Sequence, residues 1–298
     1  MSAPEPGVIP PLFAGLVDDA AVFPPGNLPL PEAVAAHRRH RAAWYADLVG
    51  PFLVGSGKIA ELTELADPAD PLRVAVVVAG GAEAVGPALT AVLAAPGLVL
   101  AGAETAGDTA AVIAAYHEFL PEDLSGAVEV AYDDDLEANL ELIAATRHRA
   151  KFRTGGVVAE AFPSPEALGR FLWLCAARSL PFKLTAGLHN AMHHTDPETG
   201  FVHHGFLNVA EATLAARRQG PYLWEGGREI GEFAAILADE SGRLADRIGR
   251  AAAPEAPYTR ELFTGFGSCS IDEPLDDLVA LGLVARPAAP ARTKEQHP

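Results

Sequence analysis

The chain has 298 residues, of which 49% are hydrophobic and 20% charged, and its formal net charge is -17. This length and apolar content suffice for one large core, whereas the negative charge opposes binding to nucleic acid, whose phosphates require clustered Lys and Arg. No apolar run approaches the length of about 20 residues that crosses a bilayer, and no cationic start precedes an apolar stretch, so we expect no membrane segment and a cytoplasmic location.

A short apolar strand, a turn and an Ala/Leu-rich helix alternate about eight times along the chain. Strands are expected at Leu12–Val17, Ala46–Val54, Leu72–Val78, Gly97–Gly102, Ala127–Ala131, Ala150–Arg153, Pro181–Thr185 and Glu261–Gly265. Alternating strands and helices form parallel sheets, and eight such units close into a barrel. We therefore predict an α/β fold, a (β/α)8 TIM barrel, with an open doubly wound sheet as the alternative. This single domain spans residues 11–285, and residues 1–10 and 286–298 are expected to be flexible tails.

The longest connection, at about residues 189–258, lies between the seventh and eighth strands. It begins with a histidine-rich stretch at 189–204 and is expected to contain at least two helices, Leu207–Arg218 and Arg228–Arg250. Connections of this length in compact domains are usually functional lids or added subdomains. The pattern leaves both roles open for this helical insertion.

Two lysines are the most informative strand-end residues, because barrel enzymes carry their active sites at the carboxyl ends of the strands. Lys151 and Lys183 each stand inside an otherwise apolar strand that finishes in a small-residue turn. Two buried lysines on neighbouring strands would repel, and this repulsion and desolvation should lower the pKa of at least one. A neutral amine is a nucleophile, so the pair predicts Schiff-base catalysis on a carbonyl substrate. Alternatively, each lysine pairs with a barrel carboxylate such as Glu104 or Glu129, or binds an anionic substrate.

Four short segments resemble motifs of the deoxyribose-phosphate aldolase group of class I aldolases, in the same order: 17–24, 151–155, 183–187 and 266–270. The resemblance implies a TIM-barrel lyase in which Lys151 on the sixth strand forms the Schiff base. It also implies that Lys183 on the seventh strand tunes the pKa of Lys151, and that the segment 266–270, which is similar to the Gly-x-Ser turn of the family's eighth strand, helps to hold phosphate.

The other expected site residues follow from this hypothesis. Asp18 and Glu104 would assist proton transfer, and His189, nearest to the barrel mouth, would act as a general acid or base. Arg153 is one strand alternation from Lys151, so it should point to the same side and clamp a polar group of the substrate. Further substrate contacts are expected at Asp19, Thr154, Gly155, Gly187, Gly267, Ser268 and Ser270.

Two departures from the family indicate a different substrate. The fourth-strand aspartate of the family has no clear counterpart, and Glu104 matches it by position only. The turn after Lys183 reads Gly187-Leu188-His189 where the family has a second glycine, which removes the close backbone approach that an anion needs. We therefore expect a small-molecule carbonyl substrate and leave open whether it carries phosphate.

Two alternatives of other classes remain. Five histidines lie within 189–204, so a metal-dependent lyase or hydrolase could use His189 with acidic strand-end residues such as Asp18, Asp19 or Glu104. The third hypothesis is a non-catalytic barrel that binds a small anion. The Schiff-base hypothesis needs no cofactor, whereas a divalent metal belongs to the second. The sequence leaves a homo-oligomer open.

The two cysteines, Cys175 and Cys269, are far apart and are expected to be reduced thiols. Cys269 could act as a nucleophile, but no His or Lys is fixed beside it by the sequence, so we expect a small buried packing residue.

Overall fold

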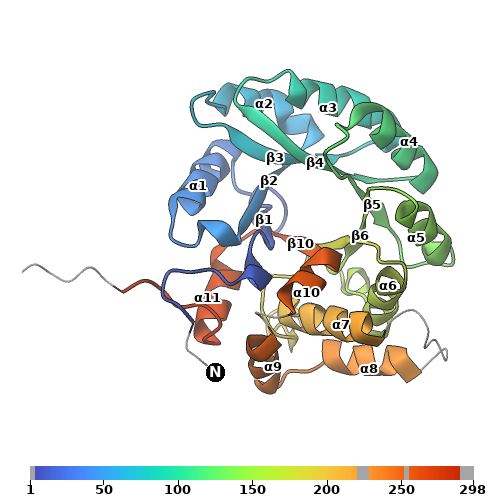
Figure 1. Cartoon of the computed structure of the whole chain (residues 1–298). Coiled ribbons are helices and arrows are strands. Elements are labelled where there is room, and N and C mark those ends of the chain that lie inside the picture. The colour runs from blue at the N-terminus through green and yellow to red at the C-terminus, as the bar shows by residue number, and fades with distance from the viewer. Residues whose placement is uncertain (1–3, 220–227, 252–254, 289–298) are drawn as a thin grey trace, which may run out of the picture.

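Within residues 4–219, 228–251 and 255–288, which the computed structural model describes, eight parallel strands close into a barrel surrounded by helices (Figure 1). The barrel strands are β1 (Val17–Asp19), β2 (Val49–Gly55), β3 (Leu72–Val78), β4 (Leu98–Ala106), β5 (Ala127–Val130), β6 (Arg149–Arg153), β7 (Phe182–Thr185) and β10 (Phe263–Ser268). Their order around the barrel is β1-β10-β7-β6-β5-β4-β3-β2, and β1 pairs with β10 to close the ring. The predicted (β/α)8 barrel is confirmed, and the open doubly wound sheet is excluded.

Burial on both faces explains why the strands form from continuous apolar runs. In β3, Val74, Val76 and Val78 are buried, and so is Ala75 on the opposite face. Strands of parallel sheets are covered on both sides, so β-branched residues are favoured throughout.

The surrounding helices are α1 (Leu30–Ala42), α2 (Ile59–Leu65), α3 (Val85–Leu93), α4 (Thr109–Phe119), α5 (Leu136–Ala144), α6 (Pro165–Ala177) and α11 (Asp272–Ala280). Side-chain caps fix two of their starts. Asp108 accepts a hydrogen bond of 2.9 Å from Ala111 N, and Ser164 accepts one of 3.2 Å from Ala167 N. These caps satisfy backbone donors that would otherwise lack partners in the first helical turn.

The insertion after β7 has two parts with different positions. A small hairpin of β8 (His194–Thr195) and β9 (Val202–His203) lies at the barrel mouth, where its residues line a cavity described below. The helices α7 (Phe206–Gln219), α8 (Arg228–Leu237), α9 (Arg243–Ala251) and α10 (Ala256–Leu262) follow. Helix α7 packs against α6, α8, α9 and α10 on the outside (Figure 1). The insertion therefore both borders the mouth and thickens the outer layer.

The single helix expected at Arg228–Arg250 is wrong, because the chain breaks between α8 and α9. Asp239 accepts a hydrogen bond of 2.7 Å from Ser241 N, which is an Asx turn that competes with the helical hydrogen bonds.

The first and last barrel strands begin later than expected. Residues Pro11–Phe13 form a short 3₁₀ helix, so the strand predicted at Leu12–Val17 starts at Val17 and includes both aspartates. Glu261 belongs to α10, whose first turn contains Pro257, so the last strand starts at Phe263 and ends at Ser268.

The N-terminal segment differs from the expected tail where it is described. Gly7 N donates a hydrogen bond of 2.8 Å to Ala285 O, and Ile9 is buried. Residues 1–3 and 289–298 of the two expected tails lie outside the described residues. None of the helices in the described ranges is long and apolar enough to cross a membrane.

Candidate active site

The two lysines lie side by side inside the barrel. Lys151 on β6 and Lys183 on β7 are partners in the parallel register of these strands, and both side chains are almost fully buried. Their strand neighbours Phe152 and Leu184 belong to the apolar core, as the alternation of side chains along a strand requires. Barrel interiors are normally filled by branched apolar residues, so two lysines there need compensating groups.

A shared carboxylate lies between the two ammonium groups. Glu104 on β4 contacts Lys151 Nζ through Oε2 at 2.8 Å and forms a shorter contact with Lys183 Nζ through Oε1. Asp18 on β1 accepts a hydrogen bond of 2.5 Å from Lys183 Nζ. The Asp18 carboxylate fits because Gly50 faces it: a Cβ at Gly50 would lie 2.1 Å from Asp18 Oδ1.

A second carboxylate binds Lys151 from the other side. Glu129 on β5 places Oε2 at 3.0 Å from Lys151 Nζ and Oε1 at 3.2 Å from the Arg153 guanidinium. Three carboxylates thus face three cations, and we refer to them together as the charged cluster: Asp18, Glu104, Glu129, Lys151, Lys183 and Arg153. The formal charges of the cluster sum to zero.

The pKa shifts follow from this arrangement. Burial alone would raise the pKa of Glu104, but the Lys151 and Lys183 ammonium groups hold it well below its usual range. Burial alone would lower the pKa of Lys151, but the Glu104 and Glu129 carboxylates raise it above its ordinary value. The prediction that Lys183 lowers the pKa of Lys151 by repulsion is therefore wrong, because carboxylates outweigh the repulsion between the lysines.

A cavity of about 610 Å³ opens at the carboxyl ends of the strands, and we call it the central cavity. Its polar and charged lining includes Glu104, Lys151, Arg153, Thr185, His189, Asn190, His194, Asp196, His203, Cys269 and Glu273. Of the two lysines, Lys151 lines this cavity, whereas Lys183 contacts Asp18 and Glu104 in the buried interior. The geometry thus distinguishes the lysine that a substrate can reach from the lysine that holds Glu104.

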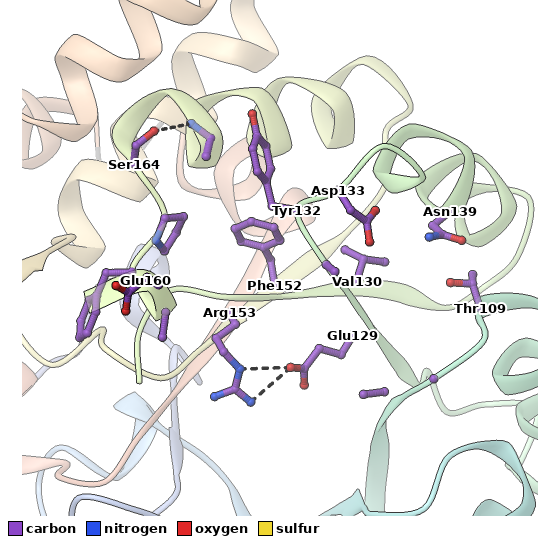
Figure 2. Close-up of a pocket in the computed structure, with 17 residues that line it drawn as sticks. Thr109, Glu129, Val130, Tyr132, Asp133, Asn139, Phe152, Arg153, Glu160 and Ser164 are labelled. Atoms are coloured by element: carbon purple, nitrogen blue, oxygen red, sulfur yellow. Dashed lines mark hydrogen bonds and ion pairs between the residues drawn. The ribbon is translucent and has the colours of Figure 1, made fainter. Parts of the chain in front are cut away.

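A second cavity of about 760 Å³, the outer cavity, lies beside the ends of β4, β5 and β6 and the start of α6. Figure 2 shows Arg153 paired with Glu129 at this cavity, with the rings of Tyr132 and Phe152 nearby. Arg153 and Phe162 line both cavities. The Arg153 guanidinium therefore stands at the boundary between them.

No protein-family model matches this chain. No significant match is found among curated proteins either. The assignment of roles thus depends on the geometry of the site.

The expected substrate contacts divide into two groups. Arg153, Gly187 and Gly267 line the central cavity. Thr154 instead ties two strand ends together, because its Oγ1 donates to Ala186 O at 2.5 Å. Gly155 packs against Gly187, where a Cβ would lie 2.7 Å from Gly187 Cα.

The two expected serine contacts also serve the local turn. Ser268 Oγ donates to Ser270 O at 2.6 Å, and the Ser270 amide donates back to Ser268 Oγ at 3.2 Å. Ser270 Oγ accepts a hydrogen bond of 3.2 Å from Glu273 N at the start of α11. These contacts shape the turn after β10 and, through it, the position of Cys269.

Asp19 does not contribute to the central cavity as expected. It points to the side of β1 opposite to Asp18 and hydrogen-bonds with His37 Nδ1 of α1 at 2.9 Å, in a buried pair. It also accepts a hydrogen bond of 3.1 Å from Ala21 N. Asp19 therefore fixes α1 and the turn after β1 against the barrel.

The histidine-rich stretch contributes three residues to the central cavity, His189, His194 and His203. The metal-dependent alternative requires these to converge with the acidic strand ends, but His189 pairs with Glu273 at 2.8 Å, and Asp18 and Glu104 pair with Lys183. Within the described residues, no three or more His, Cys, Asp or Glu side chains are grouped so that they could hold a metal ion. The ligand set of that alternative is thus not assembled in this part of the chain.

The expected alternative in which a lysine pairs with Glu129 is confirmed, because Glu129 Oε2 lies 3.0 Å from Lys151 Nζ. Two other residues of the site were not among the predicted ones. Cys269 was expected to be a packing residue, but it lines the central cavity beside His189. Glu273 had no sequence signal, because it reaches the site only through the start of α11.

Proposed function

We propose that the chain is a class I lyase that forms a Schiff base between Lys151 and a small carbonyl substrate. The observation that carries this proposal is a lysine in the barrel interior that reaches the central cavity while two carboxylates contact its Nζ. Buried charges are costly, and groups with shifted pKa values in a cavity are typical of catalytic sites.

The first step requires Lys151 to lose a proton. Glu129 is the better acceptor, because its carboxylate lies 3.0 Å from Lys151 Nζ and is partly exposed to solvent, whereas Glu104 is held ionised by two lysines. The neutral amine then attacks the carbonyl carbon, and water leaves with the proton that Glu129 returns, which gives the iminium. The bond between the carbons α and β to the iminium breaks next. The β-hydroxyl gives its proton to Glu129 and becomes the carbonyl of the first product, and the electron pair of the broken bond moves into the iminium to form an enamine. The resulting enamine is protonated and hydrolysed to release the second product.

The remaining members of the charged cluster position these groups. Lys183, held by Asp18, fixes the Glu104 carboxylate against Lys151. Glu104 stands on the fourth strand and contacts both lysines, which is the place where the aldolase resemblance expects an acidic residue. This agreement supports the proposal, in which Asp18 and Glu104 are positioning residues and Glu129 accepts the proton of Lys151.

The charges at the mouth favour a substrate without phosphate. Asp196 and Glu273 line the central cavity, and Asp272 and Glu273 occupy the first turn of α11, where an anion would otherwise find a favourable helix end. Arg153 is already paired with Glu129. We therefore propose an uncharged or hydroxylated carbonyl compound. The same charge balance gives little support to the non-catalytic anion-binding alternative.

Borohydride trapping tests the proposal. The sequence holds four lysines, Lys58, Lys151, Lys183 and Lys294, so an adduct is readily assigned by mass spectrometry. With a panel of short aldehydes and ketones, we expect reduction to fix the carbonyl compound on Lys151. Lys151→Met should abolish this adduct, whereas Lys58→Met, at an exposed lysine paired with Glu61, should leave it unchanged.

Absence of any adduct on Lys151 across the panel, or labelling of Lys58 to the same extent as Lys151, would reject the imine mechanism. Tight binding of a small anion without an adduct would favour the binding alternative instead.

A further inference from the structure

The two cysteines differ sharply in their surroundings. Cys175 lies within α6 and is fully buried, whereas Cys269, in the turn after β10, is partly exposed and lines the central cavity. Sγ of Cys269 lies 3.9 Å from Nε2 and 3.8 Å from Nδ1 of His189. The packing role expected for Cys269 is therefore incomplete, because barrel closure places an imidazole beside its thiol.

A carboxylate orients this imidazole. Glu273 Oε2 lies 2.8 Å from His189 Nδ1, and both side chains line the central cavity. When Nδ1–H donates to a carboxylate, the neutral ring keeps its lone pair on Nε2, which is then free to accept a proton from a nucleophile. Nucleophile, base and orienting carboxylate thus follow one another within contact distance.

The thiol needs such a base. Burial raises the pKa of Cys269, the Glu273 charge raises it further, and backbone N–H groups of Gly26 and Cys269 offset only part of this shift. A protonated thiol is a poor nucleophile unless a neighbouring group removes its proton during attack.

Gly26 is required for this arrangement. A Cβ at Gly26 would lie 2.9 Å from Cys269 Cβ and 2.9 Å from Ala21 O. Only glycine lets the backbone approach the cysteine this closely. The turn after β1 is therefore packed directly against Cys269.

We propose that Cys269, His189 and Glu273 form a second reactive centre, which takes an acyl group from an ester or thioester and transfers it to water. The proton of Cys269 moves to His189 Nε2 as Sγ bonds to the acyl carbon. The bond from that carbon to the leaving oxygen or sulfur then breaks, and the leaving group takes the proton from Nε2. Water attacks the resulting thioester with His189 as the base, the Sγ–C bond breaks, and a carboxylic acid and the free thiol are released. Lys151 takes no part in these steps.

Acylation by p-nitrophenyl acetate tests this centre in the full chain. We expect a burst of p-nitrophenol close to one equivalent per chain, with the acetyl group on the peptide that contains Cys269. His189→Ala should slow the burst by on the order of 100-fold, and Glu273→Gln by on the order of 10-fold. Imidazole added in solution should restore part of the rate to His189→Ala, which a purely structural role of His189 would not allow.

Cys175→Ala is the matched control, because it removes the other thiol from the core of α6 without touching the central cavity, and its burst should be unchanged. Cys269→Ser, nearly equal in size, should remove the burst while far-UV circular dichroism stays that of the parent chain. Acylation of Cys269 at the same rate with and without His189 would reduce the centre to an accessible thiol and overturn the proposal. Absence of a burst, or acetylation confined to lysines, would overturn it as well.

Discussion

Each charge in the charged cluster depends on its neighbours for its ionisation state. Glu129 is the least buried carboxylate of the cluster and contacts Lys151 and Arg153 through different oxygens. Its removal leaves Lys151 with Glu104 as its remaining ion-pair partner in the described part of the chain. Ionisation of Lys151 should thus respond to substitutions on β5.

Replacement of Glu129 by glutamine should lower the pKa of Lys151. Burial already favours the neutral amine, and one of the two carboxylates that oppose this effect is lost. The pH at which borohydride trapping reaches half of its maximum should therefore shift to lower pH. Glu137→Gln is the control, because Glu137 forms an exposed ion pair with Arg178 on the outer layer. An unchanged midpoint in Glu129→Gln would show that Glu129 does not set the charge of Lys151.

The two adjacent aspartates of β1 show what the sequence could not settle at the residue scale. With the first strand expected at Leu12–Val17, Asp18 and Asp19 both followed the strand end, and both were expected to contribute to the active site. The strand instead contains them, so alternation sends Asp18 to Lys183 and Asp19 to His37. The lysines were located correctly because their strands, β6 and β7, were predicted with nearly correct bounds.

At the scale of elements, the long insertion is tied together by one buried amide. Asn208 of α7 donates to Ile236 O at 2.9 Å and to Asp239 O at 2.8 Å, and its Oδ1 accepts from His193 N at 2.9 Å. It thus joins α7 to the carboxyl end of α8 and to the segment leading into the β8–β9 hairpin. Gly205 allows this contact, since a Cβ there would lie 2.4 Å from Asn208 Oδ1.

Asn208→Ala should lower the free energy of unfolding by roughly 2–4 kcal/mol, because the buried His193 N–H and the partly buried Asp239 carbonyl lose the Asn208 side chain and Ile236 O loses one of its two donors. Denaturant unfolding followed by circular dichroism measures this loss. Asn139→Ala, at a partly buried asparagine lining the outer cavity, should cost less than about 0.5 kcal/mol. A similar small loss for Asn208→Ala would mean that water or repacking replaces the amide.

Whether a segment is a helix or a strand was predictable where the local sequence pattern determines it. It was not predictable where contacts with distant segments determine it. The apolar runs of β3 and β5 identified these strands within one residue at each end. Glu261 and Leu262 were expected to begin the last strand, yet they end helix α10 (Ala256–Leu262), in which Thr259 and Leu262 are buried. The Cys269–His189–Glu273 centre had no local signal, since His189 lies 80 residues from Cys269.

At the scale of the whole molecule, two kinds of electrostatics coexist. The net charge of -17 acts between exposed groups and is screened by salt, whereas the charged cluster is largely buried and balanced. Added salt should therefore raise the free energy of unfolding of the molecule without changing the part of that free energy that the charged cluster contributes.

Glu104→Gln tests whether salt leaves the stabilisation by the charged cluster unchanged. It leaves two buried ammonium groups short of a carboxylate and should cost roughly 3–5 kcal/mol. As NaCl is raised from about 0.01 M to about 0.1 M, the Debye length falls from about 30 Å to about 10 Å, and the thermal midpoint of the parent chain should rise. The stability difference between parent and variant should stay constant across the series. A difference that shrinks with salt would place Glu104 in contact with solvent.

The pairing of β1 with β10 also affects how the chain folds while it is being synthesised. Asp18 and Lys183 are 165 positions apart, and β10, which stands between their strands, is synthesised after both of them. A nascent chain that has made both lysines still lacks the strand that closes the ring around them. Without β10 no strand joins β1 to β7, so Asp18 is not held against Lys183 and such fragments should not settle into a finished barrel. Early termination would then yield material for proteolysis rather than a partly working protein.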